Sequence, residues 1–325
     1  MIKALQCKSD THLFSTIEDL NQISELRTDL NNLFWLDLYQ PTEDELQQVA
    51  KEFNFHPLAV EDASHSHQRP KVEEYDNFFF VVFYAASLSE KRRNLEISEL
   101  KMFMGENYLV TVHSQPVKEL EEAERRWRRN AERMERGIGV MLYSLLDAIV
   151  DNYFPIVDNL VERSEVMEDQ IFLGRAGEAN FTSKLLKLKK LFLQLRRLAG
   201  PERDVLNVLT NRDSPIFNET NLVYFRDIYD HLLRVSDTLD LYRDQVTSAM
   251  DANLAVVSND LNKVMRTMTA ASIILMTDAL LAGIWGMNFE NIPELKWEYG
   301  YFIALALMFG IDLVLYYLFK RRKWL

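Results

Sequence analysis

The sequence has few cysteines, an unbalanced charge and no proline in much of its C-terminal third. Cys7 is the single cysteine among 325 residues, which excludes a disulfide framework within the chain. Acidic residues outnumber basic residues by 49 to 37, and the net charge is −12. This excess argues against nucleic acid as a partner, because phosphate binding requires a basic face. It suits a protein that handles cations.

Two further absences bear on localisation and catalysis. The N-terminus, MIKALQCKSDTHLF, lacks the long apolar stretch of a signal peptide, so we expect the first part of the chain in the cytosol. We find no nucleophile motif and no phosphate-binding loop. His65 and His67 could suggest metal ligands, but no other ligand type stands at a suitable spacing. We interpret them as polar surface and expect that the protein is not an enzyme.

Apolar residues are concentrated at the C-terminal end of the chain. Two segments read TMTAASIILMTDALLAGIW (267–285) and YGYFIALALMFGIDLVLYYLF (299–319), each with one acidic residue. A helix needs about 20 mostly apolar residues to cross a bilayer. We therefore predict transmembrane helices at about 267–287 and 299–319. The alternative is a pair of buried core helices in a soluble protein.

The flanking charges predict the orientation of these helices. Lys263 and Arg266 precede the first segment, and the basic tail 320–325 follows the second. The connecting loop, 288–298, holds only Lys296 among basic residues. The positive-inside rule then places both chain ends in the cytoplasm and the loop outside. We expect a multi-pass protein of the cell (inner) membrane, with the lipid bilayer as a partner.

Residues 1–115 have the composition of an α/β domain. Runs rich in β-branched and aromatic residues predict strands, and Pro41-Thr42 followed by acidic residues predicts the start of a helix. The predicted strands are 33–39, 77–88, 97–105 and 108–114, and the predicted helices are 42–53 and 56–65.

Residues 116–262 form a long-helix region. Gly174 and Gly177 indicate a break. A basic amphipathic helix, SKLLKLKKLFLQLRRLAG (183–200), is predicted to stop at Gly200-Pro201. Its basic face fits a membrane surface, or alternatively a solvated face or one matched to the acidic helix before it.

The last cytosolic helix continues into the first membrane segment. From Phe225 to Met268 apolar residues recur at steps of 3 or 4, and no proline occurs between Phe217 and Ile292. About 70 helical residues would span roughly 100 Å. Such an apolar stripe must pack against a partner. Copies of the same chain around a central axis would provide one, as in a coiled coil.

The loop after the first membrane segment begins Gly286-Met287-Asn288 and continues FENIPEL (289–295). This resembles the GMN signature and following loop of the CorA family of magnesium and cobalt transporters, with Ile292 in place of a methionine. KRRKWL (320–325) resembles the basic terminus of that family. HQRPKVE (67–73), YSLLDAIVDNYF (143–154) and YFRDIYDHLLRVSDTLDLYRDQV (224–246) resemble further family segments in the same order. The resemblance covers nearly the whole chain.

The resemblance implies a homopentamer with an α+β cytosolic N-terminal domain, long helices that form a funnel, and two C-terminal transmembrane helices (263–325). It implies uptake of Mg²⁺, with Co²⁺ and Ni²⁺ as further ions, regulatory Mg²⁺ and no organic cofactor. Relatives that transport Zn²⁺ carry a GIN-type motif. Met287 therefore favours magnesium, with a Zn²⁺ or other transition-metal transporter, with or without proton linkage, as the alternative.

The GMN residues can select a hydrated ion. Mg²⁺ holds its waters tightly. A ring of Asn288 side-chain carbonyls can recognise these waters through hydrogen bonds without adding formal charge. Gly286 lets the chain leave the helix, and Met287 is expected to pack. Glu290 and Glu294 either raise the local cation concentration or form a solvated loop.

One face of the first membrane helix is nearly free of polar side chains. Its members follow one another at steps of 3 or 4, and only one of them is polar. They either line a pore that can close by dewetting or form a helix-packing face. These residues are Met265, Met268, Ser272, Met276, Ala279 and Gly283.

Asp278 and Asp312 are the acidic residues inside the predicted membrane helices. In an antiparallel hairpin they lie at similar depth, and we predict that they meet between the two helices with at least one protonated. The pair is either a structural hydrogen bond or a proton-sensitive element in gating. A proline usually stands in the family where this chain has Thr277.

The resemblance also places a regulatory metal site in the cytosolic part. Asp227 matches the intracellular metal sensor of the family at the subunit interface. The partner acid of the family aligns with Ser89, beside Glu90, and Glu90 is a candidate substitute. Carboxylates that face each other repel, and Mg²⁺ cancels this repulsion. An ordinary solvated Asp227 is the alternative.

Two other functions stay open. A membrane-anchored scaffold or receptor would use the rod and the anchor but leave the GMN loop unexplained. Metal efflux is the other alternative, because the sequence does not fix the direction of flux.

Overall fold

The protein is described by a computed structural model that covers residues 2–17, 23, 27–89, 94–130, 137–173, 180–211, 219–288 and 297–324. The chain forms two compact units. Unit 1 comprises Met1–Glu168 and Ser183–Ser248, and unit 2 comprises Asp169–Thr182 and Ala249–Leu325.

Unit 1 is built on a seven-stranded sheet in the order β2-β1-β3-β7-β6-β5-β4. The β3 and β7 strands are parallel and the other neighbours are antiparallel. The predicted strands are confirmed as β3 (Asn32–Tyr39), β5 (Phe78–Leu88), β6 (Leu95–Met104) and β7 (Tyr108–His113). The prediction missed β1 (Ile2–Lys8), β2 (Phe14–Ile17) and β4 (Lys71–Tyr75).

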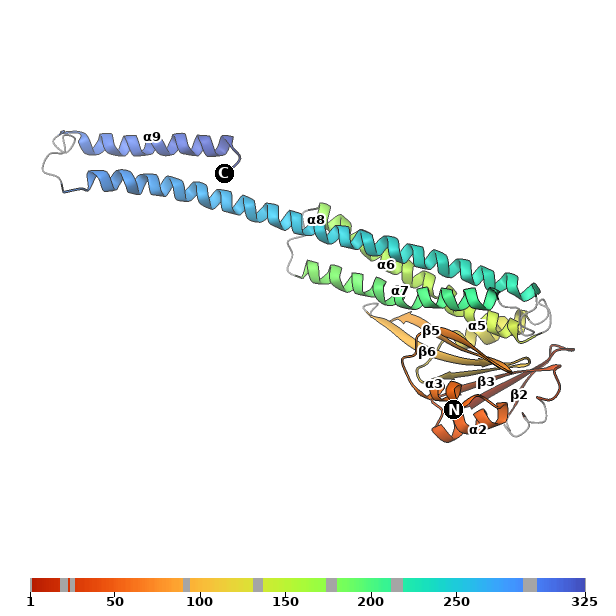
Figure 1. The fold of residues 1–325 in the computed structure, drawn as a ribbon. Helices are drawn as coiled ribbons and strands as arrows, with labels where there is room; N and C mark the ends of the chain where they lie inside the picture. Colours follow the sequence, from red (N-terminus) through yellow and green to blue (C-terminus); the bar gives the residue numbers. More distant parts are fainter. Residues whose placement is uncertain are drawn as a thin grey trace. The chain divides into compact units, whose positions relative to one another are not determined.

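Helices cover both faces of the sheet (Figure 1). On one face lie α2 (Glu43–Phe53) and α3 (Pro57–Ser64), which confirm the two short predicted helices. Thr42 and Glu45 form a capping box at the start of α2, which is why the helix begins where the sequence indicated. On the other face lie α5 (Gly139–Asp151) and the parts of α6 (Tyr153–Phe172) and α7 (Phe181–Asn211) that belong to unit 1 (Figure 1). A further helix, α4, spans Glu119–Asn130.

The predicted end of α7 at Gly200-Pro201 is wrong. The helix continues through Pro201 to Asn211. A proline inside a helix costs about 3 kcal/mol, but apolar residues are buried on both sides of it. Burying one leucine contributes about 1.5–3 kcal/mol, so together they offset the cost. Leu195, Ala199, Val205, Leu206 and Leu209 are all at most 3% exposed.

The predicted uninterrupted helix that leads into the first apolar segment is confirmed as α8, a single helix of 67 residues (Glu219–Trp285). Its stripe is buried within unit 1 from Phe225 to Val246. Tyr242 stacks on Phe192 of α7, Asp240 pairs with Arg196 of α7 at 3.0 Å, and Gln245 donates to Glu168 of α6. The chain itself therefore covers this half of the stripe. The expectation that copies of the chain cover the whole stripe is corrected for Phe225 to Val246.

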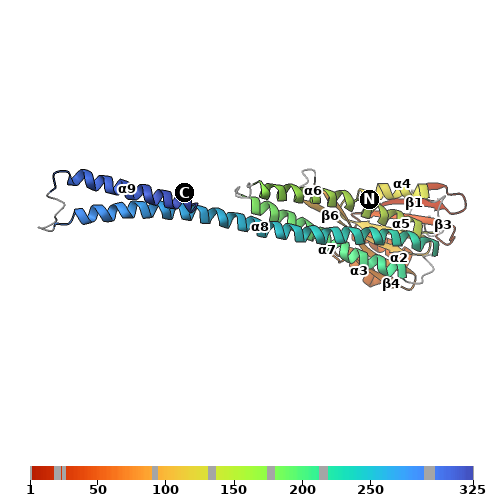
Figure 2. The same ribbon diagram turned by 90° about the horizontal axis from the view of Figure 1, so that it is seen from above.

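Unit 2 contains the apolar hairpin. The α9 helix (Gly300–Arg321) runs antiparallel beside the C-terminal end of α8 (Figure 2). At one end of the hairpin the Thr267 hydroxyl donates to the carbonyl oxygen of Trp324 at 3.0 Å, and Trp324 stacks on Phe319. The α9 helix has no buried residues, so the described part of this chain leaves most of its apolar surface uncovered.

Candidate functional site

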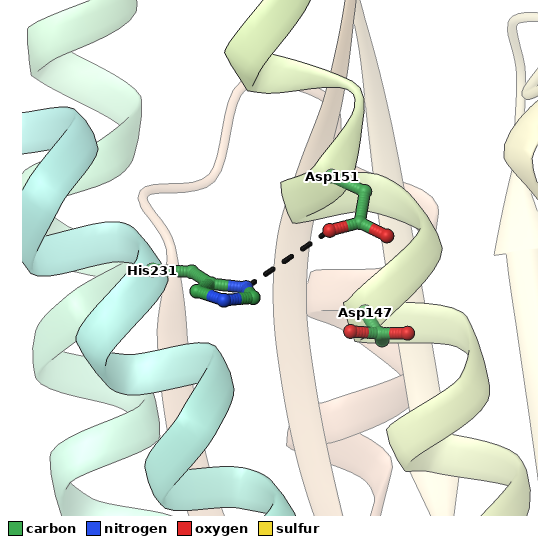
Figure 3. A group of neighbouring side chains, drawn as sticks. All are labelled: Asp147, Asp151 and His231. Atoms are coloured by element: carbon green, nitrogen blue, oxygen red, sulfur yellow. Dashed lines mark ion pairs between the residues drawn. The ribbon is translucent and has the colours of Figure 1, made fainter.

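Unit 1 brings together three side chains whose donor atoms could hold a metal ion. Asp147 and Asp151 come from α5, and His231 comes from α8 (Figure 3). One donor atom from each lies within 4.8 Å of the others. His231 Nδ1 is 3.9 Å from Asp151 Oδ1. We call Asp147, Asp151 and His231 the candidate metal centre.

Local structure explains why these side chains converge. Asp147 and Asp151 are four residues apart, so they project from the same face of α5. His231 lies on α8 between Ile228 and Leu232, which are both fully buried and hold that face of the helix in place. Phe154 packs edge-on against the His231 ring. The ring is therefore fixed toward α5.

Arg126 of α4 bonds to both carboxylates of the centre. Its guanidinium contacts Asp147 and lies 2.8 Å from Asp151. Burial lowers the pKa of Arg126, but hydrogen bonds to Asp151 and Glu122 and the charge of Asp147 outweigh burial and raise it. Burial raises the pKa of Asp147, and the charge of Asp151 raises it further. The positive charge of Arg126 thus offsets the repulsion between the neighbouring carboxylates of Asp147 and Asp151.

The donor set fits a divalent cation. Carboxylate oxygens are the ligands of Mg²⁺, and imidazole nitrogen suits Co²⁺, Ni²⁺ and Zn²⁺. Nδ1 of His231 is buried and has no hydrogen-bond partner among the described residues. A cation at this centre must share Asp147 and Asp151 with Arg126, which would weaken its binding.

Asp227, the predicted sensor, lies one turn before His231 on α8. Its Oδ1 is 3.9 Å from His231 Nε2, and its side chain is 59% exposed. The two ring nitrogens of His231 therefore face a carboxylate on either side. Glu90 lies outside the described residues. Ser89 is described, and its hydroxyl accepts from the Asn94 backbone.

Sequence reasoning missed Asp147, Asp151 and His231. The signal was present as two pairs at a spacing of four, Asp147 with Asp151 and Asp227 with His231. Such pairs share a helix face, but the sequence does not say that the two faces meet.

The predicted ion path lies in unit 2. All six residues of the predicted pore face are helical in α8. They are exposed in the single chain: Met265 is 64% exposed, Met268 is 67% and Met276 is 71%, and Ser272, Ala279 and Gly283 are also exposed. An exposed apolar face of this length requires a partner or a membrane.

The helix ends at the GMN residues. Gly286 N–H still donates to the carbonyl oxygen of Ala282 at 2.9 Å. A Cβ at Gly286 would lie 3.1 Å from the same oxygen, so glycine relieves a close approach there. Met287 and Asn288 are exposed. Glu290 and Glu294 lie outside the described residues.

Asp278 and Asp312 lie opposite each other across the hairpin of α8 and α9. Their carboxyl groups are close enough to interact directly. Each keeps one buried carboxyl oxygen, Oδ1, without a hydrogen-bond partner among the described residues. Thr277, the neighbour of Asp278, donates instead to the carbonyl oxygen of Ile273.

Three described helical segments are long and apolar enough to cross a membrane: Gly139–Phe172, Leu222–Trp285 and Gly300–Arg321. In the first, 67% of the apolar window is buried inside the fold, against 6% and 0% in the others. The first segment is therefore part of the core. The other two contain the segments that the sequence predicted to cross the membrane.

Comparison with known proteins identifies the family. A model of the family described as CorA-like Mg²⁺ transporter protein matches residues 31–321. The cobalt/magnesium transport protein CorA of Thermotoga maritima is 34% identical over 288 residues, which cover 87% of this chain and 80% of that protein. A putative metal ion transporter of Bacillus subtilis is 33% identical over 291 residues, covering 90% of this chain and 89% of that protein.

The fold is also similar to a solved structure. The complete structure of the CorA magnesium transporter from Methanocaldococcus jannaschii gives a TM-score of 0.84 at 26% identity, and the match covers 100% of this chain and 99% of that one. Sequence and fold agree over nearly the full length, and the chain belongs to the family of CorA-like Mg²⁺ transporter proteins.

Proposed function

We propose that this protein is a channel that carries Mg²⁺, and also Co²⁺ and Ni²⁺, into the cell across the cell membrane. The observation that carries the proposal is the end of α8. Its exposed apolar face leads directly into Gly286-Met287-Asn288, beside a second apolar helix in an antiparallel hairpin. Names of the relatives that include cobalt/magnesium transport support the choice of ion.

The proposed topology has two membrane spans and cytoplasmic chain ends. Residues 1–115 form the cytosolic α/β domain, 116–262 the long-helix region and 263–325 the membrane domain. Lys320 and Arg321 lie in the last turn of α9, where they also complement the helix dipole. The short loop 288–298 then lies outside.

Five chains around one axis would close the pore. In the single chain the apolar face from Met265 to Met276 is open to solvent, and burying it between copies removes this cost. Rings of Met265, Met268 and Met276 would make narrow apolar constrictions, which gate by dewetting. Asn288 would form the outer ring that reads the hydrated ion.

Regulation is proposed at Asp227 and the candidate metal centre. Mg²⁺ bound there would fix α5 against α8, because it would bridge Asp151 with carboxylates of the neighbouring helix or of another copy. High internal Mg²⁺ would hold the ring closed, and low Mg²⁺ would release it. Glu90 remains a candidate partner acid for Asp227.

Asp278 and Asp312 are proposed to share a proton. Two carboxylates in an apolar layer cannot readily both ionise, so a shared proton would join the two helices by a hydrogen bond. A proton-sensitive role in gating would require that this bond opens during transport. Glu290 and Glu294 are proposed to attract cations to the mouth of the pore.

The test is Mg²⁺ influx into liposomes that hold the purified protein and an internal Mg²⁺-sensitive dye. Wild type is compared with Asn288→Ala, and the size of each oligomer is measured in parallel. Influx that disappears in Asn288→Ala at unchanged oligomer size supports the proposal. No Mg²⁺ influx by a well-folded wild type contradicts it, and Zn²⁺ with a pH gradient is then the next ion to test.

A further inference from the structure

Among the described residues, the C-terminal part of β5 has no strand partner on the side of β4. The β4 strand pairs with β5 only as far as the Lys71–Val82 pair. Beyond Val82, the backbone groups of alternate residues point to the side that β4 has left. An open sheet edge inside a protein needs other partners for its N–H and C=O groups.

Three side chains from the helical layer supply these partners. The Tyr84 N–H donates to Glu202 Oε1 of α7 at 2.9 Å. The Tyr153 hydroxyl donates to the Tyr84 carbonyl oxygen at 2.6 Å. Asn152 Nδ2 donates to the Ala86 carbonyl oxygen at 2.9 Å. The junction between α5 and α6, together with α7, therefore closes the edge of β5.

Counting protons favours a protonated Glu202. The Tyr153 oxygen lies 2.6 Å from the Tyr84 carbonyl oxygen, and it lies 3.0 Å and 2.9 Å from Glu202 Oε1 and Oε2. A hydroxyl has one proton and can satisfy only one of them fully. A carbonyl cannot donate. The second contact becomes a hydrogen bond only when Glu202 carries a proton and donates it to Tyr153.

The surroundings favour this neutral form. Glu202 and Tyr153 are both fully buried. The neighbouring elements contribute acids. The negative charge of Glu119 of α4 raises the pKa of Tyr153, and the negative charge of Glu99 of β6 raises the pKa of Tyr84. Burial raises the pKa of Glu202 to about 8, although hydrogen bonds from Tyr153 and Tyr84 oppose the rise.

We propose that Glu202, Tyr153 and the Tyr84 backbone form a proton-operated latch between the sheet and the helical layer. With Glu202 protonated, Tyr153 donates to Tyr84 and the latch is closed. With Glu202 ionised, the Tyr153 proton turns to the carboxylate, the Tyr84 carbonyl loses its donor, and the latch opens. The proton released by Glu202 passes to solvent.

The latch lies next to the candidate metal centre in the chain. Asp151 precedes Asn152 and Tyr153, which hold the edge of β5. Opening the latch would free the end of α5 and weaken metal binding there. This consequence rests on the proposed function, whereas the latch itself does not.

The sign of the pH dependence follows from linkage. Between the ordinary glutamate pKa of about 4.3 in the unfolded chain and about 8 in the folded protein, only the folded state holds the proton. The contribution of Glu202 to stability is therefore full at low pH and is lost as the pH rises through the folded pKa.

The test uses the full-length protein, with infrared difference spectra between about pH 6 and about pH 10. Wild type should lose one buried carboxylic-acid carbonyl band near pH 8. The amide I band of an isotope-labelled Tyr84 carbonyl should shift to higher frequency over the same pH range, because this carbonyl loses the Tyr153 hydroxyl as its donor. Both changes should vanish in Glu202→Gln and persist in Glu119→Gln. Equal pH dependence in wild type and Glu202→Gln would overturn the latch.

A second variant keeps the test decisive if Glu202→Gln fails to fold. Tyr153→Phe removes the hydroxyl that links Glu202 to the Tyr84 carbonyl, so the Tyr84 carbonyl band should no longer shift when Glu202 titrates. A shift equal to that of wild type would contradict the proposal. None of these readouts depends on transport. An intact latch with no pH effect on Mg²⁺ inhibition would therefore reject only the link to the metal centre.

Discussion

The two halves of α8 have the same apolar period but different surroundings. From Phe225 to Val246 six members of the stripe are at most 1% exposed. In the later half Leu254 is 60% exposed and Leu261 is 62% exposed. The periodicity thus identifies an apolar face, but it does not identify what covers the face. In the first half it is this chain, and in the second half we propose other copies and the membrane.

This contrast suggests that the two halves of α8 have different functions. The covered half carries His231 beside Asp147 and Asp151, where a bound ion can alter packing. The uncovered half carries the proposed pore face. Both regions belong to one continuous helix, and we propose that a change at the metal centre passes along it.

The largest expected effect comes from the covered half. Leu232→Ala should lower the free energy of unfolding by about 2–5 kcal/mol, because it leaves a cavity at a fully buried position. Leu254→Ala is the matched control; in the dissociated chain, where Leu254 is 60% exposed, it should change the free energy of unfolding by about 0.5 kcal/mol or less. Denaturant unfolding of the full-length protein in detergent measures both. Equal losses in the two variants would remove the distinction between the halves.

The uncovered half should instead govern assembly. Leu261→Asn should weaken the oligomer by about 1.5–3 kcal/mol for each subunit, because an apolar contact between copies is lost. The mass of the oligomer on dilution measures this. Asp260→Asn, a neighbouring exposed position, should leave the mass unchanged. A stable oligomer in Leu261→Asn would mean that copies do not cover this face.

Substitutions in the two halves of α8 should affect inhibition by internal Mg²⁺ and ion flux separately. Asp151→Asn should raise the internal Mg²⁺ concentration needed to inhibit flux about tenfold, or about 1.4 kcal/mol of binding free energy. It should leave the flux at low internal Mg²⁺ unchanged. Ser272→Ala should leave the inhibition constant unchanged, because Ser272 lies outside the metal centre. The same inhibition in wild type and Asp151→Asn would exclude the centre as a sensor.

The smallest expected effect concerns the intramembrane acids. Asp278→Asn and Asp312→Asn keep a hydrogen bond across the hairpin, so we expect a stability change within about 0.5–1.5 kcal/mol. A proton-sensitive gate would make flux depend on pH in wild type but not in the variants. Unchanged stability and flux at every pH would contradict the gating role and leave the structural one.

Local signals account for what the sequence predicted correctly. The capping box at Thr42, the β-branched runs of the central strands and the 3- and 4-residue steps of α8 all act within one element. Helix and strand therefore follow from neighbouring residues. The two apolar C-terminal segments are equally local, since length and composition decide them.

What the sequence could not decide depends on burial and on contacts between distant segments. Helix α7 continues past Pro201 because apolar residues on both sides are buried. His231 follows Asp151 by 80 positions and meets it only because α5 and α8 pack together. Glu202 is one of 49 acidic residues in the sequence, and only the fold places it against a sheet edge away from water. The sequence alone determined the helices, the apolar segments and the family signature, whereas only the tertiary structure decided which side chains lose solvent and gain one another, because desolvation and through-space contact are properties of the packed chain.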